Sequence, residues 1–594
     1  STFGQGNAGN VTVGAKNAVD LANGYIYSTV EAGGVGKAGN IDINATRLSL
    51  TDGAQLLTTS DASATQPAGR EDAGNVNLKV TGAVDIAGHK NGFSSGIFAY
   101  MLSLSQRGVG NGGNIDINAA NLSLTDGAEL FTSTSGVGNA GNVTVSAKNA
   151  VFLAGAFTGI LSTIPAGGVG KSGNIDINAA NLSLTDGAQL AASTYGQGSA
   201  GNVTVAAKDT VTVSGTNQET ELPSGLFTFT DSTSTGIGGD ISANTNIFRI
   251  SDGALLDANT ANNQKGGDIT VNANVFEALN GGKLTTTTSS NGRAGKITVN
   301  ADDQLIISGI DPSYSDRIAK FPESVNIGAN SGLFVNSTGS GITGDIEINS
   351  PKITLDNQGK LNAESAFGNG GNINVNSDLL LLHRNSQIST SAGTEKLGGN
   401  GGNININSRF IVAVPKENSD ISANAFSGTG GRVDITTNGI FGILPQKSPT
   451  ENSDITVSSQ LGVSGQVTIN SPDTEPSHGL IQLPSNLVDV SQQITQGCTP
   501  RRGQNASSFI ATGRGGLPQS PNEPLRGQAV ITSWVDLPPQ ATAITDKLST
   551  ATVTKSTDQI VEAQGWIVDD KGDVILVAQS GQSFSIPSAM SCSQ

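Results

Sequence analysis

The sequence predicts an all-β fold, a right-handed parallel β-helix of about fifteen coils with about three short strands per coil. One phrase, Gly-Asn-Ile-Asp-Ile-Asn or a close variant, returns about once every thirty residues. Apolar and polar residues alternate after each copy, which is typical of strands. No helical period lies between these alternations. A chain made of one short repeated unit forms a solenoid, in which each coil stacks on the previous one.

The copies of the phrase divide residues 1–470 into coils. Each copy begins with a glycine: Gly9, Gly39, Gly74, Gly113, Gly141, Gly173, Gly201, Gly239, Gly267, Gly295, Gly344, Gly371, Gly402, Gly431 and Gly465. Successive strands lie about 4.8 Å apart, so the repeats predict a rod on the order of 70 Å long. The right-handed sense follows from strand twist, which also makes parallel crossovers right-handed.

The stretch Gly113–Ala140 shows one coil clearly. Alternation at Ile115–Ile117 predicts a first strand, and alternation at Leu122–Leu124 predicts a second. The tripeptide Thr125–Gly127 has the composition of a turn, with a glycine that is free to take a positive φ. The run Leu130–Thr134 predicts the third strand, and a glycine-rich bend follows it.

An asparagine ends many copies of the phrase. Asparagine side chains that stack at one bend can hydrogen-bond from coil to coil, so we expect a structural ladder rather than a ligand site. The predicted ladder residues are Asn44, Asn118, Asn178, Asn272, Asn300, Asn349, Asn376, Asn407 and Asn470.

Composition and charge exclude several classes of function. The formal net charge is −17, and no basic run with interleaved aromatic residues is present, so nucleic acid is not an expected partner. The sequence has no apolar run of about 18 residues, so it predicts no transmembrane helix. Residues 1–6 are similar to the mid-repeat segment 193–198 and do not form a signal peptide. We therefore expect a piece of a longer protein.

Three coils are longer than the rest, and their extra residues fall after the second strand. They are residues 89–94, 216–222 and 311–330, and each leads into Ser-Gly-Ile-Phe or Ser-Gly-Leu-Phe. Insertions at equivalent points of a solenoid emerge on one side, often the contacting side. We expect the longest insert to be a carbohydrate- or protein-contacting loop, with a tolerated surface insertion as the alternative. Its candidate contact residues are Tyr314, Arg317, Lys320 and Phe321.

The sequence changes in character after Asn470. This change predicts a β-helix domain at 1–470 and a C-terminal region at 471–594 with proline-rich linkers. Residues 564–578 predict a β-hairpin around an Asp-Asp-Lys-Gly-Asp turn. Such a segment can cap or dock on the unpaired strand edges of a solenoid. Cys498 and Cys592 lie in this region and leave open two reduced thiols or one disulfide.

Several of these segments resemble a known family. The segments 479–484, 486–489, 497–498 and 509–518, with the closing hairpin, look like the C-terminal signature of large cyanobacterial exoproteins of the filamentous-haemagglutinin type. The Gly-Asn-Ile coils and the Ser-Gly-Leu-Phe inserts are similar to the same family. The resemblance implies a passenger of two-partner secretion, with an outer-membrane barrel transporter as its export partner. It also implies a secreted or surface-attached β-helical adhesin, preceded in the full protein by a secretion domain.

Catalytic and metal-ligating patterns are weak. Asp116 and Asp176 face outward but belong to the repeat, so we expect a solvated face rather than a glycosidase pair. The three histidines are scattered, and no nucleophile elbow, phosphate loop or Cys-x-x-Cys is present. We expect no enzyme activity and no cofactor, and weak calcium binding at turn aspartates stays open. A catalytic group would be expected to depart from the repeat and to have His, Arg or Lys nearby.

These observations together predict a secreted, cell-surface rod that attaches to surfaces, cells or extracellular matrix through glycan or protein ligands. One alternative is a subunit of an extracellular filament or sheath, in which copies join end to end. Another is a polysaccharide-degrading β-helix enzyme, because the fold alone does not exclude catalysis.

Overall fold

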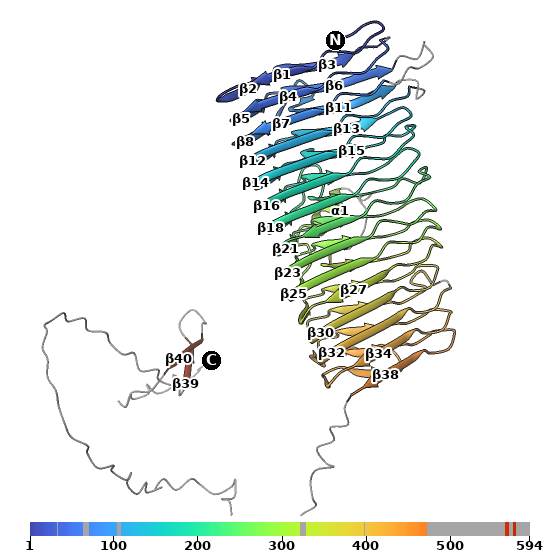
Figure 1. Cartoon of the computed structure of the whole chain (residues 1–594). Helices are drawn as coiled ribbons and strands as arrows, with labels where there is room; N and C mark the ends of the chain where they lie inside the picture. The colour runs from blue at the N-terminus through green and yellow to red at the C-terminus, as the bar shows by residue number, and fades with distance from the viewer. Residues whose placement is uncertain are drawn as a thin grey trace, which may run out of the picture. The chain divides into compact units, whose positions relative to one another are not determined.

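The computed structural model describes residues 1–32, 34–62, 71–103, 108–320, 328–396, 398–471, 565–568 and 574–577. The chain divides into two compact units, Ser1–Leu483 and Pro484–Gln594. The first unit is a stack of parallel coils that runs from β1 to β38 (Figure 1). This stack confirms the predicted parallel β-helix. We number the coils 1 to 15 by the glycines given above.

Sheet 1 contains the first and second strands of the coils and has 21 strands. In some coils the two strands join into one long strand: β12 (Ile115–Thr125), β14 (Val143–Ala154), β16 (Ile175–Thr185), β18 (Val203–Ser214), β23 (Ile269–Leu279), β25 (Ile297–Ser308), β30 (Asn372–Leu382) and β32 (Asn403–Ala413). In other coils the first strand is separate: β1 (Val11–Gly14), β4 (Ile41–Ala45), β7 (Val76–Val80), β20 (Ile241–Asn244), β27 (Asp345–Asn349), β34 (Arg432–Thr436) and β38 (Gln466–Asn470). The separate second strands are β2 (Ala18–Ala22), β5 (Arg47–Thr51), β8 (Ala83–Ala87), β21 (Ile247–Ser251), β28 (Lys352–Asp356) and β35 (Gly439–Phe441).

Sheet 2 contains the third strands of coils 1 to 14 and has 15 strands, because coil 14 contributes two. They are β3 (Tyr25–Val30), β6 (Gln55–Ala62), β11 (Gly96–Ser103), β13 (Glu129–Thr134), β15 (Gly159–Thr163), β17 (Gln189–Ala191), β19 (Gly225–Phe227), β22 (Leu255–Asp257), β24 (Lys283–Thr285), β26 (Gly332–Phe334), β29 (Lys360–Asn362), β31 (Gln387–Ser389), β33 (Asp420–Ser422), β36 (Leu444–Gln446) and β37 (Asp454–Thr456). Equivalent residues of neighbouring coils pair in register, so each position of the repeat forms a column along the stack.

The core lies between the two sheets and is filled by the inward residues of all three strands. In coil 4, Ile115, Leu124 and Leu130 are fully buried. Coils 8 and 9 place Phe248 and Phe276 in the same column, where their rings stack with centroids 5.6 Å apart. Burial of each such side chain contributes about 1.5–3 kcal/mol, and the columns repeat this contribution along the stack.

The glycine that begins each of coils 2 to 15 is required by close stacking. A Cβ atom at Gly113 would lie 1.8 Å from the carbonyl oxygen of Gly74, and one at Gly173 would lie 2.0 Å from that of Gly141. Neither distance can accommodate a side chain. The turn glycine has a different reason, because φ is 83° at Gly127 and 56° at the preceding Asp126. Positive φ is easily adopted by glycine and tolerated by aspartate.

A continuous asparagine ladder runs along sheet 1, but it uses the second residue of the phrase. The side-chain oxygen of each residue accepts a hydrogen bond from the backbone N–H of the equivalent residue in the next coil, at 2.8–3.0 Å. The ladder runs through Asn10, Asn40, Asn75, Asn114, Asn142, Asn174, Asn202, Asp240 and Asp268 to the N–H of Lys296. Side-chain oxygens thereby satisfy donors at the bend that strand pairing leaves over.

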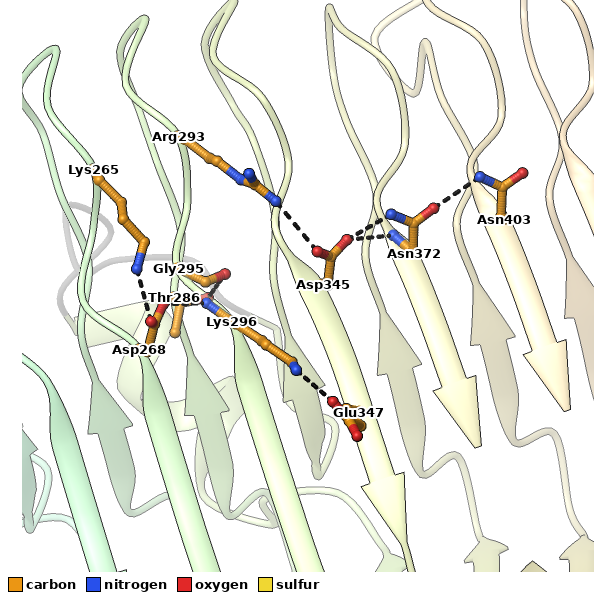
Figure 2. Close-up of polar contacts among 10 residues, drawn as sticks. All are labelled: Lys265, Asp268, Thr286, Arg293, Gly295, Lys296, Asp345, Glu347, Asn372 and Asn403. Carbon is orange, nitrogen blue, oxygen red and sulfur yellow. Dashed lines mark hydrogen bonds and ion pairs between the residues drawn. The ribbon is translucent and has the colours of Figure 1, made fainter. Parts of the chain in front are cut away.

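Lys296 interrupts this ladder because its side chain has no oxygen. Its ammonium pairs instead with Glu347, and Arg293 pairs with Asp345 at 3.2 Å (Figure 2). The Asp345 carboxylate then accepts from the side-chain amide of Asn372 at 2.7 Å, and a new series of side-chain contacts begins (Figure 2).

The predicted ladder residues form side-chain hydrogen bonds in one part of the stack. Asn244, Asn272, Asn300, Asn349 and Asn376 are joined amide to amide at 2.7–2.8 Å. Among the described residues, no amide-to-amide bond joins the other predicted members, which are Asn44, Asn118, Asn178, Asn407 and Asn470. Several of them have no asparagine beside them, since the register places Lys79, Ser146, Ala206 or Thr436 in the neighbouring coil.

The second unit contains one described element, an antiparallel pair of β39 (Gly565–Val568) and β40 (Val574–Val577). This pair confirms the predicted hairpin. Cys498 and Cys592 lie outside the described residues, and their pairing stays a prediction.

Candidate functional site

The outer face of sheet 2 carries an apolar row along coils 1 to 7. The row is the outward-facing middle position of each third strand. Its members pair in register from coil to coil: Tyr27, Leu57, Phe98, Phe131, Leu161, Ala191 and Phe227. Rings also meet beside the row, because Phe98 and Tyr100 lie 6.4 and 6.0 Å from Phe131 between ring centroids. By contrast, the first outward-facing position of the strands in sheet 1 is polar, with Asp116, Thr144 and Asp176 in successive coils.

All five tyrosines of the chain lie on this side of the solenoid. Tyr25, Tyr27 and Tyr100 belong to sheet 2, with Tyr25 and Tyr27 46 % and 52 % exposed. Tyr195 follows β17 and packs against Phe229 at 5.9 Å between ring centroids. Tyr314 lies in α1 (Tyr314–Lys320), within the longest insert. A chain with 4 % aromatic residues thus concentrates its tyrosines on one surface.

A buried serine fixes each insert to the preceding coil. The serine of the Ser-Gly-Ile-Phe or Ser-Gly-Leu-Phe phrase accepts a hydrogen bond from the N–H of a turn glycine: Ser95 from Gly53, Ser224 from Gly187 and Ser331 from Gly281, at 2.7–2.9 Å. The next residue is glycine because the backbone of the next coil lies close to it and the phenylalanine ring folds back over it. A Cβ at Gly225 would lie 2.2 Å from the carbonyl oxygen of Leu255 and 2.7 Å from the Phe227 ring. The phrase therefore ends an insert and presents an aromatic ring on sheet 2.

The second and third inserts meet over coil 8, although their contacting residues Thr216 and Arg317 are 101 positions apart in the sequence. Arg317 donates to the hydroxyl of Thr216 at 3.4 Å and forms an ion pair with the buried Asp311. Both inserts close on Gly253, where a Cβ would lie 2.6 Å from Asp311 and 3.0 Å from Thr216. The first insert, which contains the antiparallel strands β9 (His89–Lys90) and β10 (Phe93–Ser94), lies in coil 3, apart from this pair.

The two inserts enclose a cavity of about 340 Å³ against sheet 2. Sheet 2 and the residues that follow its strands contribute Phe227, Phe229, Leu255, Asp257, Asn259 and Lys283. The inserts contribute Glu221, Pro223, Tyr314, Arg317 and Ile318. We call this cavity the insert pocket. A wider, polar hollow of about 910 Å³ lies over sheet 1 and includes Asp42, Asn44, Asp116 and Asn118.

Lys283 is a buried cation in the insert pocket, with 5 % of its surface exposed. Its ammonium donates to the carbonyl of Gly281 at 3.0 Å. Burial lowers the pKa of Lys283 to about 8, with Asp311 opposing this shift and Arg317 adding to it. The register places Lys283 beside Leu255, which is also buried.

Asp257 is the second unusual group in the pocket. Burial raises the pKa of its carboxyl to about 7, although hydrogen bonds from Thr285 and Asn259 favour the charged form. Thr285 donates from its hydroxyl at 2.9 Å, and Asn259 donates from its backbone N–H at 3.1 Å. Asp257 and Lys283 therefore both change protonation near neutral pH, which is typical of functional sites as well as of buried ion networks.

The structure places two of the four predicted contact residues in the insert pocket. Tyr314 and Arg317 line it, with the Arg317 guanidinium 5.9 Å from the centroid of the Tyr314 ring. Lys320 ends α1, and nothing is described of its side chain; Phe321 lies outside the described residues. The sequence analysis missed α1 itself. Its available signals are Pro312 and Ser313 before the first turn and Asp316 within it.

The sequence analysis also missed the pocket residues on sheet 2. Asp257 stands where coil 7 has Phe227, so it interrupts the apolar row, whereas the column of Lys283 already holds polar residues such as Glu129 and Gln189. That departure, with a nearby arginine, is the signal that was expected of a chemical site. It could not be connected to the inserts without knowing that residues 216–222 and 311–330 meet.

Comparison with known proteins gives no relative: no family model, no curated protein and no solved structure matches the chain. The resemblance to filamentous-haemagglutinin-like exoproteins therefore stays a prediction. Within the described ranges, no group of three or more His, Cys, Asp or Glu residues could hold a metal ion. Across the same part of the chain, no helix has the length and apolar character needed to cross a membrane.

Proposed function

We propose that the protein is an extracellular attachment rod that contacts its target through the outer face of sheet 2. The observation that carries this proposal is the location of the apolar row and of three of the five tyrosines on that face, with Tyr195 and Tyr314 beside it. Outward positions of a sheet are ordinarily polar, and contiguous apolar positions on a surface mark an interaction site. The repeat itself contributes the length and the flat, regular surface on which these side chains stand.

Aromatic side chains support this surface as a contact for glycans or proteins. Tyrosine and phenylalanine bury a large area at a small cost in side-chain entropy, and tyrosine keeps a hydroxyl for hydrogen bonding. A pyranose ring has an apolar C–H face that packs flat on such a ring. The secretion, the cell-surface location and the export partner remain part of the proposal, supported by the resemblance described above.

The proposal is tested by retention of the purified chain on immobilised polysaccharides and on cell-wall material. We expect the double substitution Phe98→Ser and Phe131→Ser to reduce retention, because it removes the centre of the apolar row. The matched control is Phe152→Ser, which removes a 40 % exposed phenylalanine from the outer face of sheet 1. Equal retention of all three proteins would contradict the proposed contact face.

A second candidate, degradation of polysaccharides, is favoured by one observation. The insert pocket brings Asp257 and Lys283, whose pKa values lie near neutral, together with the Glu221 carboxyl. Groups that change protonation near the working pH are suited to general acid–base chemistry. Release of reducing ends or of unsaturated sugars from neutral and acidic polysaccharides tests this candidate. No release with any substrate that the protein binds would remove it.

A further inference from the structure

We infer that the insert pocket is a binding site for one acidic sugar residue, a hexuronate, whose carboxylate pairs with Lys283. This inference rests on the proposed attachment function, because it identifies a class of glycan that the rod would contact. It adds a pocket-type site to the open aromatic surface of coils 1 to 7. Three features of the pocket point to this ligand: a buried lysine ammonium, an aromatic wall and polar groups for hydroxyls.

The Lys283 ammonium is the donor in the pocket that calls for an anion. Among the described residues, no carboxylate is within ion-pair distance of the Lys283 ammonium, and one carbonyl oxygen accepts from it. The Nε of Arg317 is buried and has no hydrogen-bond partner, although its terminal nitrogens bind Asp311 and Thr216. A buried cation without an anionic partner is unfavourable. A ligand carboxylate would supply the anionic partner that the Lys283 ammonium lacks among the described residues.

The wall opposite these donors is apolar and partly aromatic. Phe227 and Phe229 face outward from coil 7, Leu255 from coil 8, and Tyr314 and Ile318 from the third insert. These side chains can cover the C–H face of a sugar ring. A free inorganic anion would leave this apolar surface unused, so the wall favours an organic acid with a ring.

The remaining polar groups suit the hydroxyls of such a ring. Thr285 and Asn259 both donate to Oδ1 of Asp257, and within the described part of the chain no donor reaches Oδ2. Oδ2 can therefore bind a ligand hydroxyl. With its pKa raised to about 7, Asp257 is largely neutral below that pH and does not repel a carboxylate. Glu221 also lines the pocket.

The size of the cavity agrees with one residue rather than a chain. Its volume of about 340 Å³ is near the lower end of the usual range for ligand pockets, which is about 300–1,000 Å³. The occupant is thus a terminal or side-branch uronate rather than an internal stretch of a polysaccharide.

The test uses the full chain with D-glucuronate and D-galacturonate as probes, and with glucose, galactose and benzoate as comparison ligands. Isothermal titration or saturation-transfer NMR measures binding. We expect at least one uronate to bind with a Kd on the order of 0.1–10 mM, and the neutral sugars to bind at least about tenfold more weakly. Benzoate binding as tight as the uronate would overturn the assignment of a sugar.

Substitutions identify the pocket. Lys283→Met should weaken uronate binding by about tenfold or more, while Lys283→Arg should retain most of it. Lys360→Met is the matched control, because Lys360 holds the same column position as Lys283 in coil 11, away from the insert pocket. Circular dichroism shows whether each variant is folded. Equal uronate affinity in wild type and a folded Lys283→Met would overturn the inference.

The pH dependence gives a readout that a merely structural lysine would not produce. The charged groups around Lys283 in the pocket are Asp311, Arg317, Asp257 and Glu221. Lys283 itself and Asp257 change protonation near neutral pH. As the pH rises from 6 to 9, Lys283 loses its charge and Asp257 gains one. Uronate affinity should therefore fall by about tenfold or more. A flat profile would contradict pairing with Lys283.

The outcomes separate this inference from the proposed function. If uronates do not bind but the Phe98→Ser and Phe131→Ser protein loses retention, the pocket assignment fails and the attachment proposal stands. If uronates bind through Lys283 but retention never depends on sheet 2, the pocket assignment stands and the attachment face is wrong.

Discussion

Coils 4 to 6 and coils 7 to 10 share one core but differ on the outer face of sheet 2. Leu190 in coil 6 and Leu256 in coil 8 occupy the same column and are both 0 % exposed. Outward positions of coils 4 to 6 hold Phe131, Leu161 and Ala191, which solvent partly reaches. In coils 7 to 10, inserts cover the sheet and enclose charged residues. Stacking determines what faces inward, whereas the covering segments determine what the outer face can hold.

This difference concerns energy as well as shape. A lysine and an aspartate on an open sheet surface would remain hydrated and keep their ordinary pKa values. Under the inserts, burial shifts the pKa of Lys283 downward and that of Asp257 upward. Both shifts mean that the folded protein disfavours the charged forms. Groups that lower the stability of the fold are expected at functional sites, where they are retained because the activity requires them.

The largest expected effect tests whether the two sets of coils really share one core. Leu190→Ala and Leu256→Ala should each reduce the free energy of unfolding by about 2–5 kcal/mol, because each removes a fully buried side chain from the same column. Guanidinium unfolding followed by circular dichroism measures both. If one substitution reduced the free energy of unfolding by less than half as much as the other, the inserts would change the core as well as the surface.

The second prediction sharpens the contrast between a structural and a functional residue. Lys283→Met should increase the free energy of unfolding at pH 7 by about 1–3 kcal/mol. The folded pKa of about 8 lies below the ordinary lysine value of 10.5, so this penalty is full below pH 8 and disappears as the pH rises towards the unfolded value. Lys360→Met should have little effect. A destabilised Lys283→Met protein would indicate that the lysine mainly supports the fold.

The third prediction concerns the pH dependence of stability. Asp257 has a folded pKa of about 7 against an ordinary value of 3.8, so the folded state binds more protons between these values. Its contribution should lower stability by about 3 kcal/mol as the pH rises from 4 to 7. Asp257→Asn should remove this part of the profile in thermal unfolding, while the exposed control Asp116→Asn should keep it. Identical profiles for wild type and Asp257→Asn would contradict a buried, neutral carboxyl.

The smallest expected effect concerns the ladder of coils 4 to 6. Asn142→Ala removes one acceptor and should cost about 0.5–1.5 kcal/mol, because the N–H of Asn174 loses its 2.8 Å partner. Asn142→Asp should restore most of the loss, since Asp240 and Asp268 accept in the same way in coils 8 and 9. Denaturant midpoints of the three proteins measure the difference. No cost in Asn142→Ala would mean that water replaces the ladder at this position.

The contrast between the coils also explains what could be predicted from the sequence. Local rules predict the strands and turns: alternation at Ile115 and Leu122 marks strands, and Asp126-Gly127 marks a turn with positive φ. The ladder was predicted at the last asparagine of the phrase, but its longest run uses the second. Both positions are spaced identically in the sequence, and only the bend geometry decides which side chain reaches a backbone N–H of the next coil.

The insert pocket could be predicted in part. The position of the inserts and the unusual composition of the longest one identified Tyr314 and Arg317. Lys283 and Asp257 stayed hidden because each resembles an ordinary polar residue on a solvated sheet face. Their significance depends on two inserts that meet over Gly253, and such a contact across about 100 residues has no local signal.

Hydroxyl-radical footprinting of the full chain bound to a polysaccharide with uronate side branches tests the central claim most directly, because it reads side-chain exposure on both faces at once. The account predicts that Phe98, Phe131, Phe227 and Tyr314 are protected on binding, while Phe152 and Phe410 on sheet 1 keep their reactivity. Protection of the sheet 1 residues with no change on sheet 2 and the insert pocket would contradict it.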